Sequence, residues 1–441
     1  MTDAIIRDLG EGLIIRHATA DDADGLVKFN TAIHSEDEHE AKGLEDWTLD
    51  LISGEGPTFD PGDFTVVEDT HTGEIVSSCC LISQTWSYEG IPFKVGRPEL
   101  IGTKKEFRRR GLVRAQMDIL HQWSDARGQL VQAITGIPNY YRQFGYEMAL
   151  NLGGGLSGFQ SNVPKLKDNS EEPFTFREAT KADIPFLMAT YNRGCQRSMV
   201  YAVWNKYLWR YELTGKRKLN INRREIYVIE DHKGQPAGFI GLPAIKWGEY
   251  SGLTVFEIAS GYSWTATTPS VIRFLWEKGE SLAKEQKQSQ DKFGFFLGEV
   301  HPSYEVVASM LPQIHQPYAF YLRVPNLVEF LNEVSPALES HLADTAFDFY
   351  TGKVIISFYQ HGLQLNFKNG HIEDIKPLSF EALEDATACF PGLTFLQLLF
   401  GFRNMDELHY AHTDCSAKNK ESQHLMNSLF PKKHSDVWPI S

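Results

Sequence analysis

Residues 104 to 114, KKEFRRRGLVR, concentrate positive charge: six lysines and arginines stand there with one carboxylate and one glycine, Gly111. The chain as a whole has 441 residues and a formal net charge of -14 at pH 7. A basic cluster in an acidic chain predicts a local anion. Because arginine can bind phosphate oxygens with two hydrogen bonds, a pyrophosphate and a ribose phosphate suit this cluster. A solvated basic surface is the alternative.

The segments on either side predict how this cluster is positioned. Residues 98–102 and 130–134 are short apolar runs typical of strands. Between them, apolar residues recur at helical spacing from Leu112 to Trp123, and Gly128 ends the pattern. The order strand, glycine loop, helix, strand predicts a βαβ unit with Gly111 at the helix N-terminus. Free backbone N–H groups and a partial positive charge make such a terminus a phosphate site.

An internal repeat organises the first two thirds of the chain. RHATADD, beginning at Arg16, returns as REATKAD at Arg177, 161 residues later. VVED at residues 66–69, with a turn at Gly73, returns at nearly the same offset as VIED with a turn at Gly234. We therefore expect two related mixed α/β domains, residues 1–155 and 174–318, joined by a linker at 156–173 that is rich in glycine, proline and charge.

The pattern changes near residue 319. Residues 347–375 alternate with period two and contain Asn369-Gly370, a strong hairpin signal, and apolar helix-like runs follow. This pattern predicts a third domain, residues 319–441, with helices against one face of a sheet. The expected fold class for the whole chain is α/β (α+β).

Composition narrows the chemistry. The five cysteines have no metal-like spacing and form no disulfide framework, so we expect no metal. No apolar run spans a bilayer and the acidic start is unlike a signal sequence, so a cytoplasmic protein without a membrane span is expected. Net negative charge argues against nucleic acid and favours cationic amines. HSEDEHE, residues 34–40, is compatible with an amine-attracting acidic loop or a solvated segment, and less so with a metal site.

Two motifs resemble a known superfamily. RRRGLV, residues 108–113, resembles the Arg/Gln-x-x-Gly-x-Gly/Ala loop with which GNAT N-acetyltransferases hold the pyrophosphate of acetyl-coenzyme A, with Val113 departing from the pattern. YYRQFGY, residues 140–146, resembles their Tyr-x-x-x-Phe-Gly-Phe/Tyr segment. The repeat and the third domain resemble the Eis-like (enhanced intracellular survival) family, which has two tandem GNAT domains and a sterol-carrier-protein-like C-terminal domain.

This resemblance implies an N-acetyltransferase that moves an acetyl group from acetyl-coenzyme A, its cosubstrate, to a primary amine by direct attack in a ternary complex. Tyr141 matches the tyrosine that serves as general acid in the Eis-like family. The thioester oxygen is expected at the backbone N–H groups of Leu100, Ile101, Gly102 and Thr103. The residues expected to bind the cofactor phosphates are Arg108, Arg109, Arg110, Gly111, Leu112 and Val113.

The base that removes the amine proton is left open between two groups. Glu99 lies on the strand before the loop, but Glu257 has the corresponding place in the second copy. The family resemblance implies the α-carboxylate of Ser441, although this chain ends in serine where an aromatic residue is expected; Trp438 and Ile440 would then anchor the tail. Aligning the two glutamates sets Pro269 opposite Gly111 and leaves the second copy without the basic loop, which predicts a degenerate second domain.

The rival function is a carrier that binds acyl-coenzyme A or lipid without turnover, since sterol-carrier-like domains bind lipids. An intact residue 108–113 loop together with Tyr141 favours the enzyme. The expected partner is a small-molecule or peptide amine, and a homo-oligomer stays possible.

Overall fold

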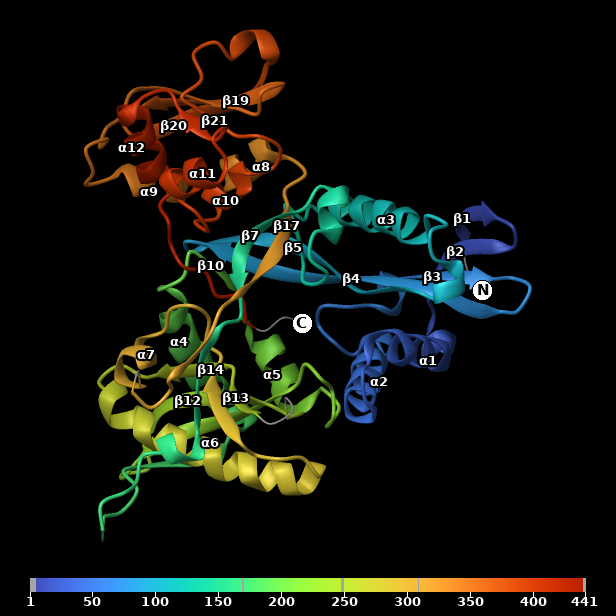
Figure 1. Cartoon of the computed structure of the whole chain (residues 1–441), viewed down its shortest axis with the longest axis vertical. Helices are drawn as coiled ribbons and strands as arrows, with labels where there is room; N and C mark the ends of the chain where they lie inside the picture. Colours follow the sequence, from blue (N-terminus) through green and yellow to red (C-terminus); the bar gives the residue numbers. More distant parts are fainter. Residues whose placement is uncertain (1–4, 169, 247–249, 308, 439–441) are drawn as a thin grey trace.

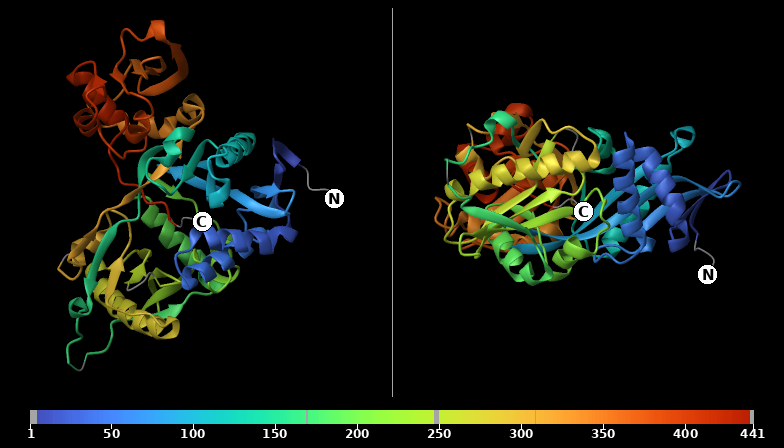
Figure 2. Two further views of the ribbon diagram at one scale, coloured as in Figure 1. Left: turned by 45° about the vertical axis from the view of Figure 1, so that its right-hand side comes forward. Right: turned by 90° about the horizontal axis from the view of Figure 1, so that it is seen from below.

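The computed structural model describes residues 5–168, 170–246, 250–307 and 309–438. It is a mixed α/β protein, as the sequence predicts. We distinguish a first unit (residues 5–152 with 318–323), a second unit (155–315) and a third unit (327–429). The first unit lies between the other two along the molecule (Figures 1 and 2).

The first unit is built on one mixed sheet with helices on both faces. Its strand order is β1-β2-β3-β4-β5-β6-β17-β7. The α1 and α2 helices cover one face and α3 covers the other (Figure 1). The elements are β1 (Ile5–Gly10), β2 (Leu13–His17), α1 (Ala23–His34), α2 (Glu38–Ile52), β3 (Phe64–Asp69), β4 (Glu74–Tyr88), β5 (Ile91–Thr103), α3 (Leu112–Ala126), β6 (Val131–Ile134), β7 (Glu147–Leu152) and β17 (Tyr318–Arg323).

Alternation along β4 produces this two-sided packing. Cys80 and Ile82 belong to the core under α1 and α2, whereas Cys79 and Leu81 belong to the core under α3, because neighbouring side chains on a strand point to opposite faces. The predicted βαβ unit is confirmed: β5, α3 and β6 follow one another, and β5 pairs with β6 in parallel.

The repeated motifs form the same ion-pair network in both units. In the first unit, Arg16 donates to Asp22 through both terminal nitrogens (2.7 and 2.8 Å) and to Glu68 through Nε at 2.7 Å. In the second unit, Arg177 makes the same bonds to Asp183 (2.7 and 2.8 Å) and Glu230 (2.7 Å). Each network ties the start of a helix to the sheet beside it, which explains why these residues recur together.

The second unit contains two small sheets and four helices in its described residues. One sheet has the order β14-β12-β11-β9, the other β13-β15-β8-β16, and β10 pairs with β4 of the first unit. The elements are β8 (Gly155–Phe159), β9 (Phe174–Glu178), α4 (Ile184–Cys195), β10 (Val200–Ala202), α5 (Lys206–Thr214), β11 (Arg224–Asp231), β12 (Pro236–Pro243), β13 (Tyr250–Leu253), β14 (Val255–Ile258), α6 (Trp264–Gln286), β15 (Lys292–Phe295), α7 (Pro302–Val307) and β16 (Gln313–His315).

The register supports the pairing of the two glutamates but corrects the alignment after them. Glu99 lies opposite Cys80 of β4, and Glu257 lies opposite Phe239 of β12. The next helix, α6, begins at Trp264 and contains Pro269 in its interior. Pro269 is therefore not the counterpart of Gly111, because the loop before α6 is shorter than the loop before α3.

The first two units exchange strands at the predicted boundaries. β8 begins at Gly155, where the first domain is expected to end, and runs into the segment expected as a linker, yet it pairs with β15 and β16 of the second unit. β17 begins at Tyr318, where the second domain is expected to end, yet it lies between β6 and β7 of the first sheet. The chain thus crosses between the two units twice, and backbone hydrogen bonds fix them to each other.

The third unit packs helices against a sheet of order β20-β19-β18-β21-β22. The predicted hairpin is confirmed, with Asn369 and Gly370 at positive φ between β19 and β20. The elements are α8 (Leu327–Glu333), α9 (Ser335–Leu342), β18 (Gly352–Ser357), β19 (His361–Lys368), β20 (His371–Ser379), β21 (Ala388–Cys389), α10 (Phe395–Leu399), α11 (Met405–Ala411), β22 (Ser416–Ala417) and α12 (Lys420–Leu429).

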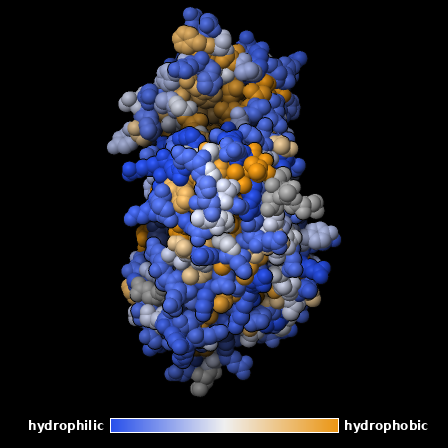
Figure 3. All heavy atoms as spheres, turned by 90° about the vertical axis from the view of Figure 1, so that its right-hand side faces the viewer, coloured by the Kyte–Doolittle hydropathy of each residue, from blue (hydrophilic) through white to orange (hydrophobic). Residues whose placement is uncertain are grey.

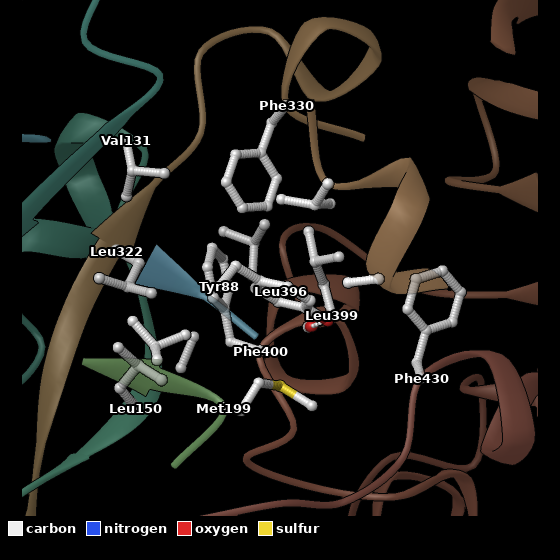
Figure 4. Close-up of a cluster of buried hydrophobic side chains, with 14 of the residues drawn as sticks. Tyr88, Val131, Leu150, Met199, Leu322, Phe330, Leu396, Leu399, Phe400 and Phe430 are labelled. Atoms are coloured by element: carbon white, nitrogen blue, oxygen red, sulfur yellow. Dashed lines mark hydrogen bonds between the residues drawn. The ribbon is translucent and has the colours of Figure 1, made fainter. Parts of the chain in front are cut away.

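A shared apolar core joins the third unit to the first (Figure 4). Tyr88 of β4 packs edge-on against Phe330 and Phe400, with ring centroids 6.1 and 6.3 Å away. Its hydroxyl donates to the Leu399 carbonyl oxygen at 2.8 Å. Away from this core, the face drawn in Figure 3 is largely hydrophilic, and hydrophobic side chains gather in a hollow at the upper end.

After α12 the chain returns to the second unit. The His434 carbonyl oxygen accepts from Met199 N at 2.7 Å, and Asp436 N donates to the Val200 carbonyl oxygen at 3.2 Å. Trp438 is buried and stacks on Trp204 with ring centroids 5.0 Å apart. The predicted anchoring by Trp438 is therefore observed, whereas Ile440 and Ser441 lie outside the described residues.

A carboxyl group of this returning tail is expected to make stability depend on pH. Burial and the nearby Glu257 carboxylate raise the pKa of Asp436 from 3.8 to about 7. Folded protein therefore holds a proton here that unfolded chain releases, and the resulting stabilisation disappears as pH rises through about 7. Asp436→Asn mimics the protonated form. Its gain in melting temperature over the parent should be larger at pH 8 than at pH 5, and thermal unfolding at both pH values measures it.

The matched control for this measurement is Asp168→Asn, which changes an exposed aspartate in a loop. It should shift the melting temperature equally at both pH values. A constant difference between Asp436→Asn and the parent would show that Asp436 is already ionised in the folded protein.

Candidate active site

The sheet of the first unit opens beside the predicted site. β5 and β6 pair only at Val95–Val131 and Gly96–Gln132. Beyond Gly96, the edge of β5 that faces β6 has no strand partner within the described chain. A bulge follows between the pairs Ser78–Gly102 and Cys80–Glu99, and Leu100 takes a left-handed φ of 50° there. Bulges of this kind redirect backbone groups and are common next to active sites.

The basic loop after β5 is only partly neutralised. Lys104 forms an ion pair with Glu74 at 2.7 Å, and Arg110 pairs with Glu11. Within the described chain, the remaining four cations have no carboxylate partner: Lys105, Arg108, Arg109 and Arg114. All four are exposed. The cluster is therefore available to an external anion.

The start of α3 fits a pyrophosphate. Gly111 caps the helix at a φ of 76°, no side chain caps its amides, and no acidic residue lies in its first turn. A Cβ added at Gly111 would meet no atom within 4 Å, so the space in front of the helix is open. Buried Gln116 fixes this end of α3 by accepting from Ser77 at 2.7 Å and donating to Thr65 at 3.0 Å.

Tyr141 lies under α3 in the same core as Cys79 and Ile134, the last residue of β6. Its ring packs edge-on against Tyr321 of β17, with ring centroids 5.6 Å apart. The ring also packs against Gly136, where an added Cβ would lie 3.0 Å from it. The hydroxyl makes no hydrogen bond to any described residue. Burial, together with Cys79 and Glu99, raises the pKa of Tyr141 well above its usual range. Tyr141 therefore stays protonated at neutral pH with its proton free to donate.

Glu99 forms an ion pair with Arg97, a fully buried guanidinium. Burial raises the pKa of Glu99 although Arg97 opposes this effect. Arg97 has two further N–H groups, at Nε and Nη1, without partners in the described chain. Sequence reasoning missed Arg97, although its spacing of two residues from Glu99 places both side chains on one face of β5. The counterpart Glu257 pairs with Arg197 of the second unit.

His34, at the end of α1, also reaches β5. A Cβ added at Gly102 would lie 3.3 Å from its Nε2. Burial lowers the pKa of His34, although a hydrogen bond to the Leu100 backbone opposes this effect, so the ring is neutral at pH 7. The sequence pattern predicts His34 only as part of an acidic segment. Leu26 and Phe29, buried on the same helix, are the signal that could have placed it on the inner face of α1.

A cavity of about 580 Å³ lies between the first and second units. It opens at the edge of β4 between its pairings with β3 and β10. Aromatic side chains from both units line it: Trp47, Phe59, Trp204 and Tyr211. Ile82 of the lining lies opposite Arg97 in the sheet, whereas Arg97 and Glu99 themselves do not line the cavity.

The cavity is not acidic, despite the net negative charge of the chain. Its charged lining residues are Asp50, Lys94, Arg127, Glu212 and Lys216. Both carboxylates are compensated, Asp50 by Arg217 at 3.2 Å and Glu212 by Lys216 at 2.6 Å. The negative charge of the chain therefore lies elsewhere.

Among the residues that the structure describes, no group of three or more histidine, cysteine, aspartate or glutamate side chains has the geometry to hold a metal ion. None of the helices in this part of the chain is long and apolar enough to cross a membrane.

Comparison with known proteins assigns this fold. Residues 14–149 match the family model of the acetyltransferase (GNAT) domain. The first unit is a GNAT domain. GNAT domains use acetyl-coenzyme A, and with this domain the chain is an acyltransferase. No curated protein matches the chain.

Solved structures share the fold over nearly the whole chain. A GCN5-related N-acetyltransferase from Anabaena variabilis superposes with a TM-score of 0.64 at 12% identity, covering 96% of this chain and 99% of its own. One from Kribbella flavida gives 0.63 at 16%, covering 96% and 97%. Eis1 from Mycobacterium abscessus gives 0.58 at 13%, covering 96% and 99%. At these identities the likeness concerns the fold.

The phosphate role of the basic loop predicts a charge effect at Gly111. Asp and Asn both tolerate a left-handed φ, so Gly111→Asp and Gly111→Asn share the same backbone strain and nearly the same size. The aspartate adds a negative charge in front of the α3 amides. Acetyl-coenzyme A should bind Gly111→Asp at least about tenfold more weakly than Gly111→Asn, a difference of ~1.4 kcal/mol. Calorimetric titration of both folded variants checks this; equal affinities would contradict the phosphate role.

Proposed function

We propose that the protein is an N-acetyltransferase that moves an acetyl group from acetyl-coenzyme A to a primary amine by direct attack in a ternary complex. The observation that carries the proposal is that three features of the first unit lie close together. The bulge on the open edge of β5, the partly neutralised basic loop at the start of α3 and the protonated Tyr141 all lie beside the gap between β5 and β6. Residues 108–113 hold the cofactor phosphates.

Tyr141 is the general acid in this proposal. As the amine nitrogen bonds to the thioester carbon, the oxygen gains charge, which the N–H groups of residues 100–103 on the open edge of β5 stabilise. When the carbon–sulfur bond breaks, its electron pair stays on sulfur, and the Tyr141 hydroxyl donates its proton there. Tyr141 suits this step because burial raises the pKa of its hydroxyl, which therefore stays protonated. The hydroxyl donates this proton to no described residue.

Glu99 is the proposed acceptor of the amine proton. The attacking nitrogen must be neutral, and an alkylammonium has a pKa of ~10. Burial raises the pKa of Glu99, which brings its basicity closer to that of the amine, while the ion pair with Arg97 opposes this rise and holds the carboxylate in place. The cavity beside this pair is the proposed acceptor site. Ser441 lies outside the described residues, so it adds no support to a base at the tail.

We further propose the Eis-like layout for the chain, with a degenerate second GNAT-like domain and a sterol-carrier-protein-like third domain. The duplicated Arg16 and Arg177 networks support the tandem arrangement. Residues 259–263, before α6, contain no lysine or arginine, which supports a second domain without a phosphate site. The likeness in fold to Eis1 from Mycobacterium abscessus extends over 96% of the chain.

Incubation with acetyl-coenzyme A and a panel of primary amines, scored by release of free thiol, tests the function. Amine-dependent thiol release and an acetylated amine in the mass spectrum are expected. Tight binding of acetyl-coenzyme A without release for any amine would contradict the enzyme and favour the carrier.

The acid role predicts a selective loss in Tyr141→Phe. The ring and its packing remain and only the proton donor is removed, so kcat should fall about 10²-fold while the KM for acetyl-coenzyme A changes little. Tyr140→Phe is the matched control, since it removes the hydroxyl of the adjacent tyrosine. Steady-state kinetics compares the two. Equal kcat values for Tyr141→Phe and the parent would contradict the acid role and show that Tyr141 contributes only to packing.

The base role predicts a change in the pH profile of Glu99→Gln. Activity needs ionised Glu99, so the parent should lose kcat/KM as pH falls through the raised pKa of this group. Glu99→Gln should lower kcat/KM about 10²-fold and abolish this loss at low pH, which is the acid limb of the pH profile. Glu257→Gln, the counterpart in the second unit, should keep both rate and limb. An unchanged limb in Glu99→Gln would place the base elsewhere, with His34 the next group to change.

A further inference from the structure

The charge of the cavity limits which amines can be acetylated. Two carboxylates line it, and each already has a cation as partner. Among the described residues, a substrate with several ammonium groups would therefore find no uncompensated carboxylate in the cavity. The site therefore disfavours polycations.

One end of the cavity offers hydrogen-bond donors in place of acceptors. Ser83 Oγ accepts from Gln129 Nε2 at 2.9 Å and from Arg127 Nη1 at 3.4 Å, so its own O–H is left to donate. No described residue accepts that proton. Lys94 Nζ bonds only to the Arg127 carbonyl oxygen, at 3.3 Å, and has no carboxylate partner in the described chain. Arg127 itself pairs with Asp63 at 2.5 Å, so Lys94 supplies the uncompensated charge.

We propose that the acceptor is an amine that carries a carboxylate at its far end, which Lys94, Ser83 and Arg127 bind, with an apolar body between the two groups. This inference rests on the proposed function, because it takes the cavity as the acceptor site. A single carboxylate is favoured because a single lining cation is uncompensated. The aromatic walls formed by Trp47, Phe59 and Trp204 fit the apolar body.

Three matched amines test the proposal: 4′-(aminomethyl)biphenyl-4-carboxylate and its analogues with a methyl or an aminomethyl group in place of the carboxylate. They share body and reacting amine and differ in charge at the far end. The parent should acetylate the carboxylate with a kcat/KM at least about tenfold above the methyl compound, and the diamine least well. Binding of each compound in the presence of coenzyme A is measured by calorimetry as well.

Variants of Lys94 identify the contact. Lys94→Gln should remove the preference for the carboxylate mainly through KM, and Lys94→Glu should reverse it toward the diamine. Lys353→Gln, an exposed lysine on β18 of the third unit, is the control and should keep the parent preference. Equal kcat/KM for the carboxylate and methyl compounds, or an unchanged preference in Lys94→Glu, would overturn the inference while the proposed function stands.

Binding separates failure of the inference from failure of the function. If the carboxylate compound binds best and Lys94→Gln abolishes this, but no amine is acetylated, the acceptor inference is supported and acetyl transfer is contradicted. If none of the three compounds binds or reacts, the cavity is not an acceptor site and the inference is overturned; the broad amine panel then decides the function.

Discussion

The separation of β5 from β6 is the constraint on which the rest of the first unit depends. Parallel pairing stops after two residue pairs, and β6 instead continues its hydrogen bonding with β17. An open strand edge inside a sheet leaves backbone N–H groups unpaired, which is costly unless a ligand or water binds them. The bulge at Leu100, the Gly111 cap and the Tyr141 ring all lie around this opening. The fold thus leaves backbone N–H groups unpaired at the places proposed for the acyl oxygen and the cofactor pyrophosphate.

Strand exchange explains how the acceptor side is formed. β17 returns from the end of the second unit to close the first sheet, and β8 leaves the first unit to join the second. These ladders hold the two units in one relative position without a flexible linker. The cavity between them is therefore lined by residues that lie far apart in sequence, such as Trp47 and Trp204. A rigid boundary of this kind allows a selective pocket, because its walls cannot move independently.

Local pattern was enough to predict the βαβ unit that positions the basic loop. The helix after Gly111 and the strands on either side of it follow from residues 98–134 alone, and the duplicated Arg16 and Arg177 motifs indicated the repeat. Tyr141 was selected through the resemblance to the Eis-like family, and its catalytic role stays a prediction. Features that depend on register between distant strands could not be predicted. The boundary strands β8 and β17, the burial of Arg97 and the compensation of Asp50 by Arg217 each depend on a partner more than a hundred residues away or on which face a strand buries. Net charge could not predict the charge of the cavity either, since it does not say where carboxylates lie.

The second unit shows what the same scaffold does without the catalytic loop. Glu257 keeps the strand position of Glu99, but it pairs with Arg197, and a small cavity beside it is lined by the returning tail through His434, Asp436 and Trp438. The Glu257 carboxylate also lies where any side chain at Gly194 would collide with it, because a Cβ there would come within 2.2 Å. Where the first unit has an open strand edge beyond Gly96, the second places its own returning tail beside Glu257. Because Trp438 in turn stacks on Trp204, which lines the cavity between the units, the tail fixes one wall of the proposed acceptor site.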